Sequence, residues 1–243
     1  MTVNQLRTLY DRLNIANTRL TAVEFRRAIR KDVKASNPKS LPDLNFIQTN
    51  NLRKSMLDRH QKNGVKFGNT IYNDLKKQTK NTKKFNPFFS EEWAKFIREV
   101  YQRDLANKIV SVKSTIAKEI KRIVDNSIAE GEAVPDITAK IDETVNSNQF
   151  YMWQAERVAR TEVGSAMNQA NDVAVNALDI DVVKQWSASL DGRERASHRR
   201  ANGEVKEKNE PFSIGLQRPH DPDAPANEVI NCRCVLLYQP KKN

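Results

Sequence analysis

The stretch SEEWAKFIREVYQRDLANKIVSVKSTIAKEIKRIV, residues 90–124, decides the fold class of this 243-residue chain. Ser90 is a favourable helix N-cap, and Glu91 and Glu92 follow it in the first turn, where acidic side chains complement the helix dipole. Apolar residues then recur every three or four positions: Trp93, Phe96, Ile97, Val100, Tyr101, Leu105, Ile109, Val112, Ile116, Ile120 and Ile123. The pattern predicts one long helix, or two abutting ones, to about residue 129 in the core of a helical bundle.

The sequence on both sides of this stretch has the same helical periodicity. Further helices are expected over residues 2–35, 44–61, 136–145 and 148–178. Gly64 follows the second of these, and the basic run 76–84 has no apolar period and is expected to be a flexible loop. In the last helix, the small residues 164–166 would let another helix approach closely.

The chain changes character after Asp181. Strands are expected over 182–190, 204–208 and 229–238, with an Asp191-Gly192 turn, a helical turn over 193–202 and an irregular loop over 211–226. We expect an α+β fold, a mainly helical body with long helices and a small C-terminal α+β module. Its expected divisions are a basic helical arm (1–86), the helical body (87–180) and the module (181–243).

The formal net charge of +11 lies in the first third of the chain. Residues 1–86 carry 19 Lys and Arg against 6 Asp and Glu, whereas the remaining two thirds are close to neutral. Clustered positive charge attracts a polyanion such as DNA, or an acidic protein surface; the alternative is a solvated surface. The candidate binding residues are Arg26, Arg27, Arg30, Lys31, Lys76, Lys77, Lys80, Lys83 and Lys84.

The sequence shows neither a bilayer-spanning apolar run nor a signal peptide, because Met1 leads into a polar amphipathic pattern. We therefore expect a soluble intracellular protein. In that setting, a disulfide framework between its two cysteines, Cys232 and Cys234, is not expected.

The C-terminal module contains a candidate metal site. Thiolates and imidazoles are the ligands that zinc prefers, and Cys232 and Cys234, at positions i and i+2 of a strand, share one face. His198 is the candidate third ligand, Asp191 a fourth, and His220 a competing ligand. The alternative is a buried pair of thiols with a surface histidine.

The same residues also permit a catalytic interpretation. His198 and Asp191, with the arginines between them, could form a general base and its orienting carboxylate in a metal-dependent nuclease. This cluster lacks the second histidine, or the carboxylate cluster placed for a divalent ion, that phosphodiester cleavage would need. We therefore favour a turn held by Asp–Arg pairs and expect no enzyme.

Six short motifs follow one another in the second half of the chain. They are Ala159-Arg160-Thr161-Glu162, Trp186, Asp191-x-Arg193-x-Arg195-x-x-His198, Gly203 with Pro211-Phe212, a proline-containing loop over 219–225, and Asn231-Cys232-Arg233-Cys234. In order and spacing they resemble the phage head morphogenesis domain typified by the F protein of phage Mu. The resemblance covers about residues 110–238, and its structural motif residues here are Arg160, Glu162, Trp186, Arg193, Arg195 and Asn231.

The resemblance implies a minor virion head protein bound at or near the portal, with roles in head morphogenesis and in DNA packaging and ejection. It implies the portal protein as partner, with scaffold or capsid proteins and double-stranded DNA, and a location in the capsid interior at the portal vertex after assembly in the host cytoplasm. It also supports a structural zinc ion at His198, Cys232 and Cys234. The alternatives are a stand-alone nucleic-acid-binding protein and a metal-dependent nuclease.

Overall fold

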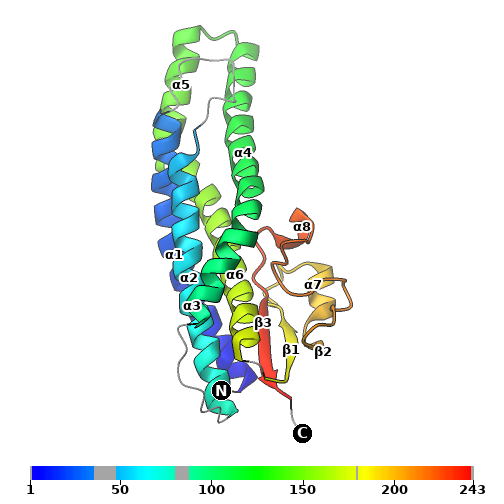
Figure 1. The fold of residues 1–243 in the computed structure, drawn as a ribbon. Coiled ribbons are helices and arrows are strands. Elements are labelled where there is room, and N and C mark those ends of the chain that lie inside the picture. The colour runs from blue at the N-terminus through cyan, green and yellow to red at the C-terminus, as the bar shows by residue number, and fades with distance from the viewer. Residues whose placement is uncertain (1, 36–47, 80–87, 179, 242–243) are drawn as a thin grey trace.

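The computed structural model describes residues 2–35, 48–79, 88–178 and 180–241 (Figure 1). The helical body contains α1 (Val3–Ala35), α2 (Asn50–Gln78), α3 (Phe88–Phe96), a π-helical turn (Ile97–Tyr101), α4 (Gln102–Ala129), α5 (Val134–Asn146) and α6 (Asn148–Leu178). The C-terminal module contains β1 (Val182–Ser187), α7 (Ala196–Ala201), β2 (Val205–Glu207), α8 (Ala226–Val229) and β3 (Val235–Pro240). The expected α+β class, a mainly helical body with a small C-terminal module, is confirmed.

Helix α6 lies at the centre of the molecule. Helices α1, α2, α3 and α5 pack against it, and β3 lies against it from the other side (Figure 1). Its buried face is rich in small side chains, which allow close approach; they are Ala155, Ala159, Ala166, Ala170 and Ala174. The described part of residues 1–86 therefore shares one core with α6.

Two expectations for the second helix were wrong. Helix α2 does not end near Gln61 but continues through Gly64 to Gln78, so that Lys76 and Lys77 are in its last turn and not in a loop. Gly64 is required inside the helix because a Cβ there would overlap the Trp93 indole, which donates to the carbonyl of Gln61 at 3.2 Å. The glycine thus serves close packing between α2 and α3 and does not end α2.

The long helix predicted from residue 90 forms, with a π-helical turn between α3 and α4. Such a turn holds one extra residue, which shifts the faces of the helices on either side of it. Tyr101 is the last residue of this turn, and its ring stacks on His60 with centroids 3.5 Å apart. The Trp93 ring also stacks on His60, with ring centroids 5.5 Å apart.

A charged network is buried beside these rings. The carboxylate of Glu162 accepts a hydrogen bond from the Tyr101 hydroxyl at 2.5 Å and pairs with Nζ of Lys108 at 2.8 Å. Lys108 also pairs with Asp104 at 2.9 Å, and Nδ1 of His60 is 3.6 Å from Glu162. Burial raises the pKa of Glu162, but the positive charge of Lys108 and hydrogen bonding with His60 outweigh it and hold the pKa well below its usual range.

The C-terminal sheet is antiparallel, with strand order β2-β1-β3. Trp186 is opposite Leu236 in the β1–β3 pair, and both are fully buried. The expected strand over 182–190 ends at Ser187. The final strand begins only at Val235, so the prediction that it carries both cysteines is wrong: they lie in the turn before it.

No helix in the described ranges is both long enough and apolar enough to cross a bilayer.

The Glu162–Lys108 pair should contribute strongly to stability. Glu162→Gln keeps the shape but leaves Lys108 short of a buried counter-charge, so the free energy of unfolding should fall by about 3–5 kcal/mol. Glu156→Gln is the matched control, because Glu156 forms an exposed pair with Arg160 on the same helix, and it should cost less than about 1 kcal/mol. Denaturant melts at neutral pH measure both, and equal effects would contradict this account.

The same pair sets a direction for pH dependence. Because the pKa of Glu162 is lowered in the folded protein, its stabilisation is present above the ordinary carboxyl pKa and is lost as pH falls. The stability difference between wild type and Glu162→Gln should therefore shrink on acidification.

Candidate metal centre and its supporting residues

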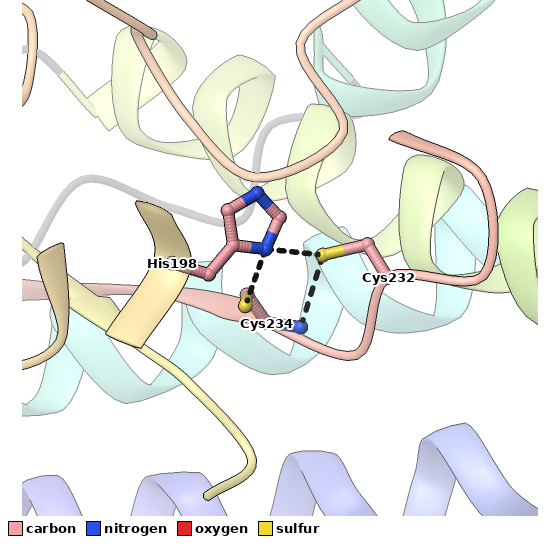
Figure 2. Close-up of side chains that lie close together, drawn as sticks. All are labelled: His198, Cys232 and Cys234. Carbon is pink, nitrogen blue, oxygen red and sulfur yellow. Dashed lines mark hydrogen bonds between the residues drawn. The ribbon is translucent and has the colours of Figure 1, made fainter. Parts of the chain in front are cut away.

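His198, Cys232 and Cys234 form a buried group whose ligand atoms all lie within 4.8 Å of one another. Figure 2 shows Nδ1 of His198 facing both sulfurs, at 3.6 Å from Cys232 and 3.4 Å from Cys234. A tetrahedral zinc ion with ordinary bonds to sulfur and nitrogen separates those two atoms by roughly 3.5 Å. The three side chains therefore fit a tetrahedral zinc ion in both chemistry and spacing.

The surroundings of the group also suit a metal. Nε2 of His198 lies 2.9 Å from the carboxylate of Glu228, the outer partner that orients many metal-binding histidines. The backbone N–H of Cys234 donates to Sγ of Cys232 at 3.4 Å, which favours a thiolate at Cys232. A hydrogen bond with Cys234, together with His220 and His198, lowers the pKa of Cys232 against the effect of burial. The pKa of Cys234 is raised because it shares that hydrogen bond and is buried.

Trp186 supports His198 from the sheet. Its ring is fully buried and meets the imidazole edge-on, with centroids 5.1 Å apart. Phe212 packs on the other edge of the indole at 5.3 Å. The Trp and Pro-Phe motifs predicted from sequence therefore lie together as a hydrophobic support beneath His198.

Helix α6 holds the turn that carries the cysteines. Arg160 donates to the side-chain oxygen of Asn231 at 2.6 Å, and the hydroxyl of Thr161 accepts the backbone N–H of Asn231 at 2.9 Å. Asn231 has a φ of +61°, a left-handed conformation that asparagine tolerates better than most residues. Two separate motifs thus meet, since the Arg-Thr-Glu helix fixes the residue just before Cys232.

Helix α1 reaches the same turn through Arg7. Its guanidinium donates to the carbonyl of Ser187 at 2.7 Å, to the Ser189 hydroxyl at 3.1 Å and to the carbonyl of Arg233 at 3.4 Å. The Ser189 hydroxyl donates to the same Arg233 carbonyl. The residue between the two cysteines is therefore tied to the N-terminal helix.

Asp191 lies near the group but outside its 4.8 Å limit. Its carboxylate accepts hydrogen bonds from Arg233 and from Arg193, and the Arg193 side chain is largely exposed. Arg195 donates to the carbonyl of Ile230 at 2.6 Å and so supports the cysteine turn from the side of α7. Asp191, Arg193 and Arg195 thus belong to a turn beside the site that side-chain hydrogen bonds hold in place.

Sequence reasoning missed two asparagines of α6. Asn168 donates to the carbonyl of Cys234 at 3.2 Å and accepts the N–H of Leu236 at 2.7 Å. Asn171 donates to the carbonyl of Leu236 at 3.3 Å and accepts from the Tyr10 hydroxyl at 3.1 Å. Both side chains are fully buried. The available signal was a pair of asparagines three residues apart, which lie on one face of a helix.

A cavity of about 280 Å³ lies between α4, α6 and the segment 220–230. Glu162 and Lys108 line it, with His220 on the C-terminal side. The small-residue stretch 164–166 also borders this region, but at Gly164 the neighbour is the His220 ring and not the helix that we expected.

The basic candidates are spread over two helices. Arg26, Arg27, Arg30 and Lys31 belong to the second half of α1, and Lys76 and Lys77 to the last turn of α2. Lys80, Lys83 and Lys84 fall outside the described residues. The structure thus does not gather the described candidates into one cluster.

The family comparison relates these features to one class, the phage head proteins. Residues 118–237, about half of the chain, match the family described as Phage Mu protein F like protein. This chain belongs to that family of phage head morphogenesis proteins. The matched range lies within the residues 110–238 to which the resemblance was assigned from sequence.

Three curated relatives align with this chain. The minor head protein GP7 of Bacillus phage SPP1 is 27% identical over 154 residues, which cover 58% of this chain and 49% of that protein. The NAD(+)--arginine ADP-ribosyltransferase EFV of Enterococcus faecalis is 27% identical over 141 residues, 55% of this chain and 28% of that protein. An uncharacterized protein of Haemophilus influenzae is 28% identical over 129 residues, which cover 53% of this chain and 26% of that protein.

The chain thus spans about a quarter to a half of the length of these relatives. No solved structure matches it.

Proposed function

We propose that this chain is a minor head protein that binds at or near the portal and acts in head morphogenesis and in DNA packaging and ejection. The alignment with the minor head protein of phage SPP1, over more than half of this chain, carries the proposal. The partners are the portal protein, neighbouring head proteins and double-stranded DNA. The protein would be in the capsid interior at the portal vertex, after assembly in the host cytoplasm.

A structural role suits the residues that suggested catalysis. Nδ1 of His198 faces the two thiols, and Nε2 lies 2.9 Å from the carboxylate of Glu228. The Asp191 carboxylate is paired with arginines and does not orient the histidine. This arrangement supports a non-enzymatic role, in which the Asp-Arg-Arg-His motif holds the segment with the two cysteines in place.

Association with the portal is tested by co-expression with the portal protein of the same phage, followed by pull-down and native mass spectrometry. We expect a stable complex containing fewer copies of this chain than of the portal protein. A portal ring recovered without it, with the free chain carrying nucleic acid, would favour the stand-alone DNA-binding alternative.

The DNA contact is proposed on the exposed face of α1. Arg12, Arg19 and Arg26 recur every seven residues, so they form one stripe along the helix, with Arg30 continuing it. No described acidic side chain pairs with Arg12, Arg19 or Arg26, and Arg12 and Arg19 are exposed. Unpaired arginines in a row suit the regularly spaced phosphates of DNA, and their binding energy comes largely from released counterions.

Replacing Arg12, Arg19 and Arg26 together by alanine should weaken binding to double-stranded DNA and lower the salt slope by about two to three, since each phosphate contact contributes about 0.9. Side-chain replacement is preferable to deletion because α1 contributes Tyr10 and Phe25 to the core. Replacing Arg98, Arg103 and Lys118, which are exposed, is the control with the same loss of charge. Equal losses in both triple variants would point to net charge and not to the stripe.

We also propose that His198, Cys232 and Cys234 hold a structural zinc ion. The spacing of the three ligand atoms and the Glu228 partner support it. When bound, the ion would cross-link α7 to the turn before β3. It would thereby hold together a module with only a small sheet of its own.

The purified full chain should contain one zinc per molecule by elemental analysis, and a strong chelator should lower its melting temperature. Cys232→Ser should lose the metal and melt at a lower temperature, with no further change on adding chelator. A wild-type protein that is free of metal after refolding with zinc, and whose melt ignores the chelator, would overturn the zinc proposal.

A further inference from the structure

Three protein ligands leave a structural zinc ion one ligand short, because closed structural sites are four-coordinate. The carboxylates of Asp191 and Glu228 are already engaged. Asp191, the fourth ligand expected from sequence, accepts hydrogen bonds from Arg193 and Arg233. Glu228 is shared between Nε2 of His198 and the Ser197 hydroxyl.

His220 is a buried group nearby that lacks a hydrogen-bond partner among the described residues. Its side chain is only 2% exposed, and neither ring nitrogen has a hydrogen-bond partner among the described residues. Burying a polar group without a partner costs free energy, so such a group in a folded protein needs a partner, which a metal ion or an ordered water can supply. The backbone of His220 has a φ of +56°, a strained conformation that its surroundings must maintain.

Helix α6 leaves room for this ring at Gly164. A Cβ at that position would overlap Nε2 of His220, so only glycine lets the imidazole lie against the helix backbone. One turn earlier on the same helix, Arg160 and Thr161 hold Asn231, the residue before Cys232. The histidine ring and the cysteine turn are therefore both positioned by two neighbouring turns of α6.

The ring also lies beside the first cysteine. His220 lies close enough to Cys232 to act electrostatically on its thiol, although no hydrogen bond joins the two side chains. The histidine is not one of the three side chains whose ligand atoms all lie within 4.8 Å of one another. A movement of its ring toward them would add a nitrogen to two sulfurs and one imidazole.

We propose that His220 is the fourth ligand, and that the site is a two-cysteine, two-histidine centre that joins α7, the loop 211–226 and the cysteine turn. The proposal rests on the zinc site proposed above. It replaces Asp191 by His220 and gives the glycine at position 164 of α6 a purpose in metal binding.

The first test measures zinc affinity of the full chain by competition with a chromophoric chelator, and ligand types by X-ray absorption. Wild type should show two sulfur and two imidazole ligands. His220→Ala should lose one imidazole and weaken binding by more than the roughly 10–100-fold expected for an outer partner such as Glu228. Asp191→Asn should keep all four ligands and lose less than about tenfold.

Gly164→Ala provides a second test that does not alter a ligand. Alanine favours a helix more than glycine does, so a purely structural glycine would be replaced with no loss of metal affinity. Here the added methyl group should displace the His220 ring and weaken zinc binding at least about tenfold. In the His220→Ala background, the same change should have no effect on affinity, because the ring is gone.

The outcomes separate the two proposals. One zinc per chain bound through a single imidazole, with affinity unchanged by His220→Ala, would overturn the role of His220 and leave the zinc site standing. Wild type that binds no zinc would overturn both. Melting curves recorded without metal show whether each variant folds, so a loss of affinity cannot be mistaken for unfolding.

Discussion

The buried carboxylate of Glu162 must keep a counter-charge, and the rest of the helical body is arranged around that requirement. Lys108 supplies the charge from α4, which fixes the rotation of α4 against α6. The π-helical turn brings the Tyr101 hydroxyl to the same carboxylate, and His60 of α2 stacks on the Tyr101 ring. Because an unpaired charge in the interior is very costly, these helices can shift relative to one another only together.

The opposite face of α6 supplies hydrogen-bond partners to the edge of β3 that does not pair with β1. Side chains of Asn168 and Asn171 bond to the backbone of Cys234 and Leu236, so the strand is paired with β1 on one side and with a helix on the other. A buried strand edge without such partners would leave backbone groups unsatisfied. This explains how so small a sheet packs directly on a long helix, and why β3 has a fixed register against α6.

The cysteine turn is the point where distant parts of the chain meet. Arg7 ties it to α1, Arg160 and Thr161 tie it to α6, and Arg195 ties it to α7. Most of these bonds end on backbone groups, so they fix the path of the turn and leave the thiols free to face His198. A metal ion at that point would therefore stabilise contacts between the module and the helical body as well as the module itself.

The sequence by itself determined the helical body, the small C-terminal α+β module and the family, because apolar periodicity and the spacing of short motifs are local properties. It also predicted that His198, Cys232 and Cys234 lie close together. Only the tertiary structure decided the partners of Glu162, the placement of the cysteines before β3, the continuation of α2 through Gly64, and the roles of Asn168, Asn171 and Arg7. Local propensity makes Gly64 a helix end, and packing against Trp93 overrules it. Such outcomes depend on residues far apart in the chain, whose meeting no local pattern encodes.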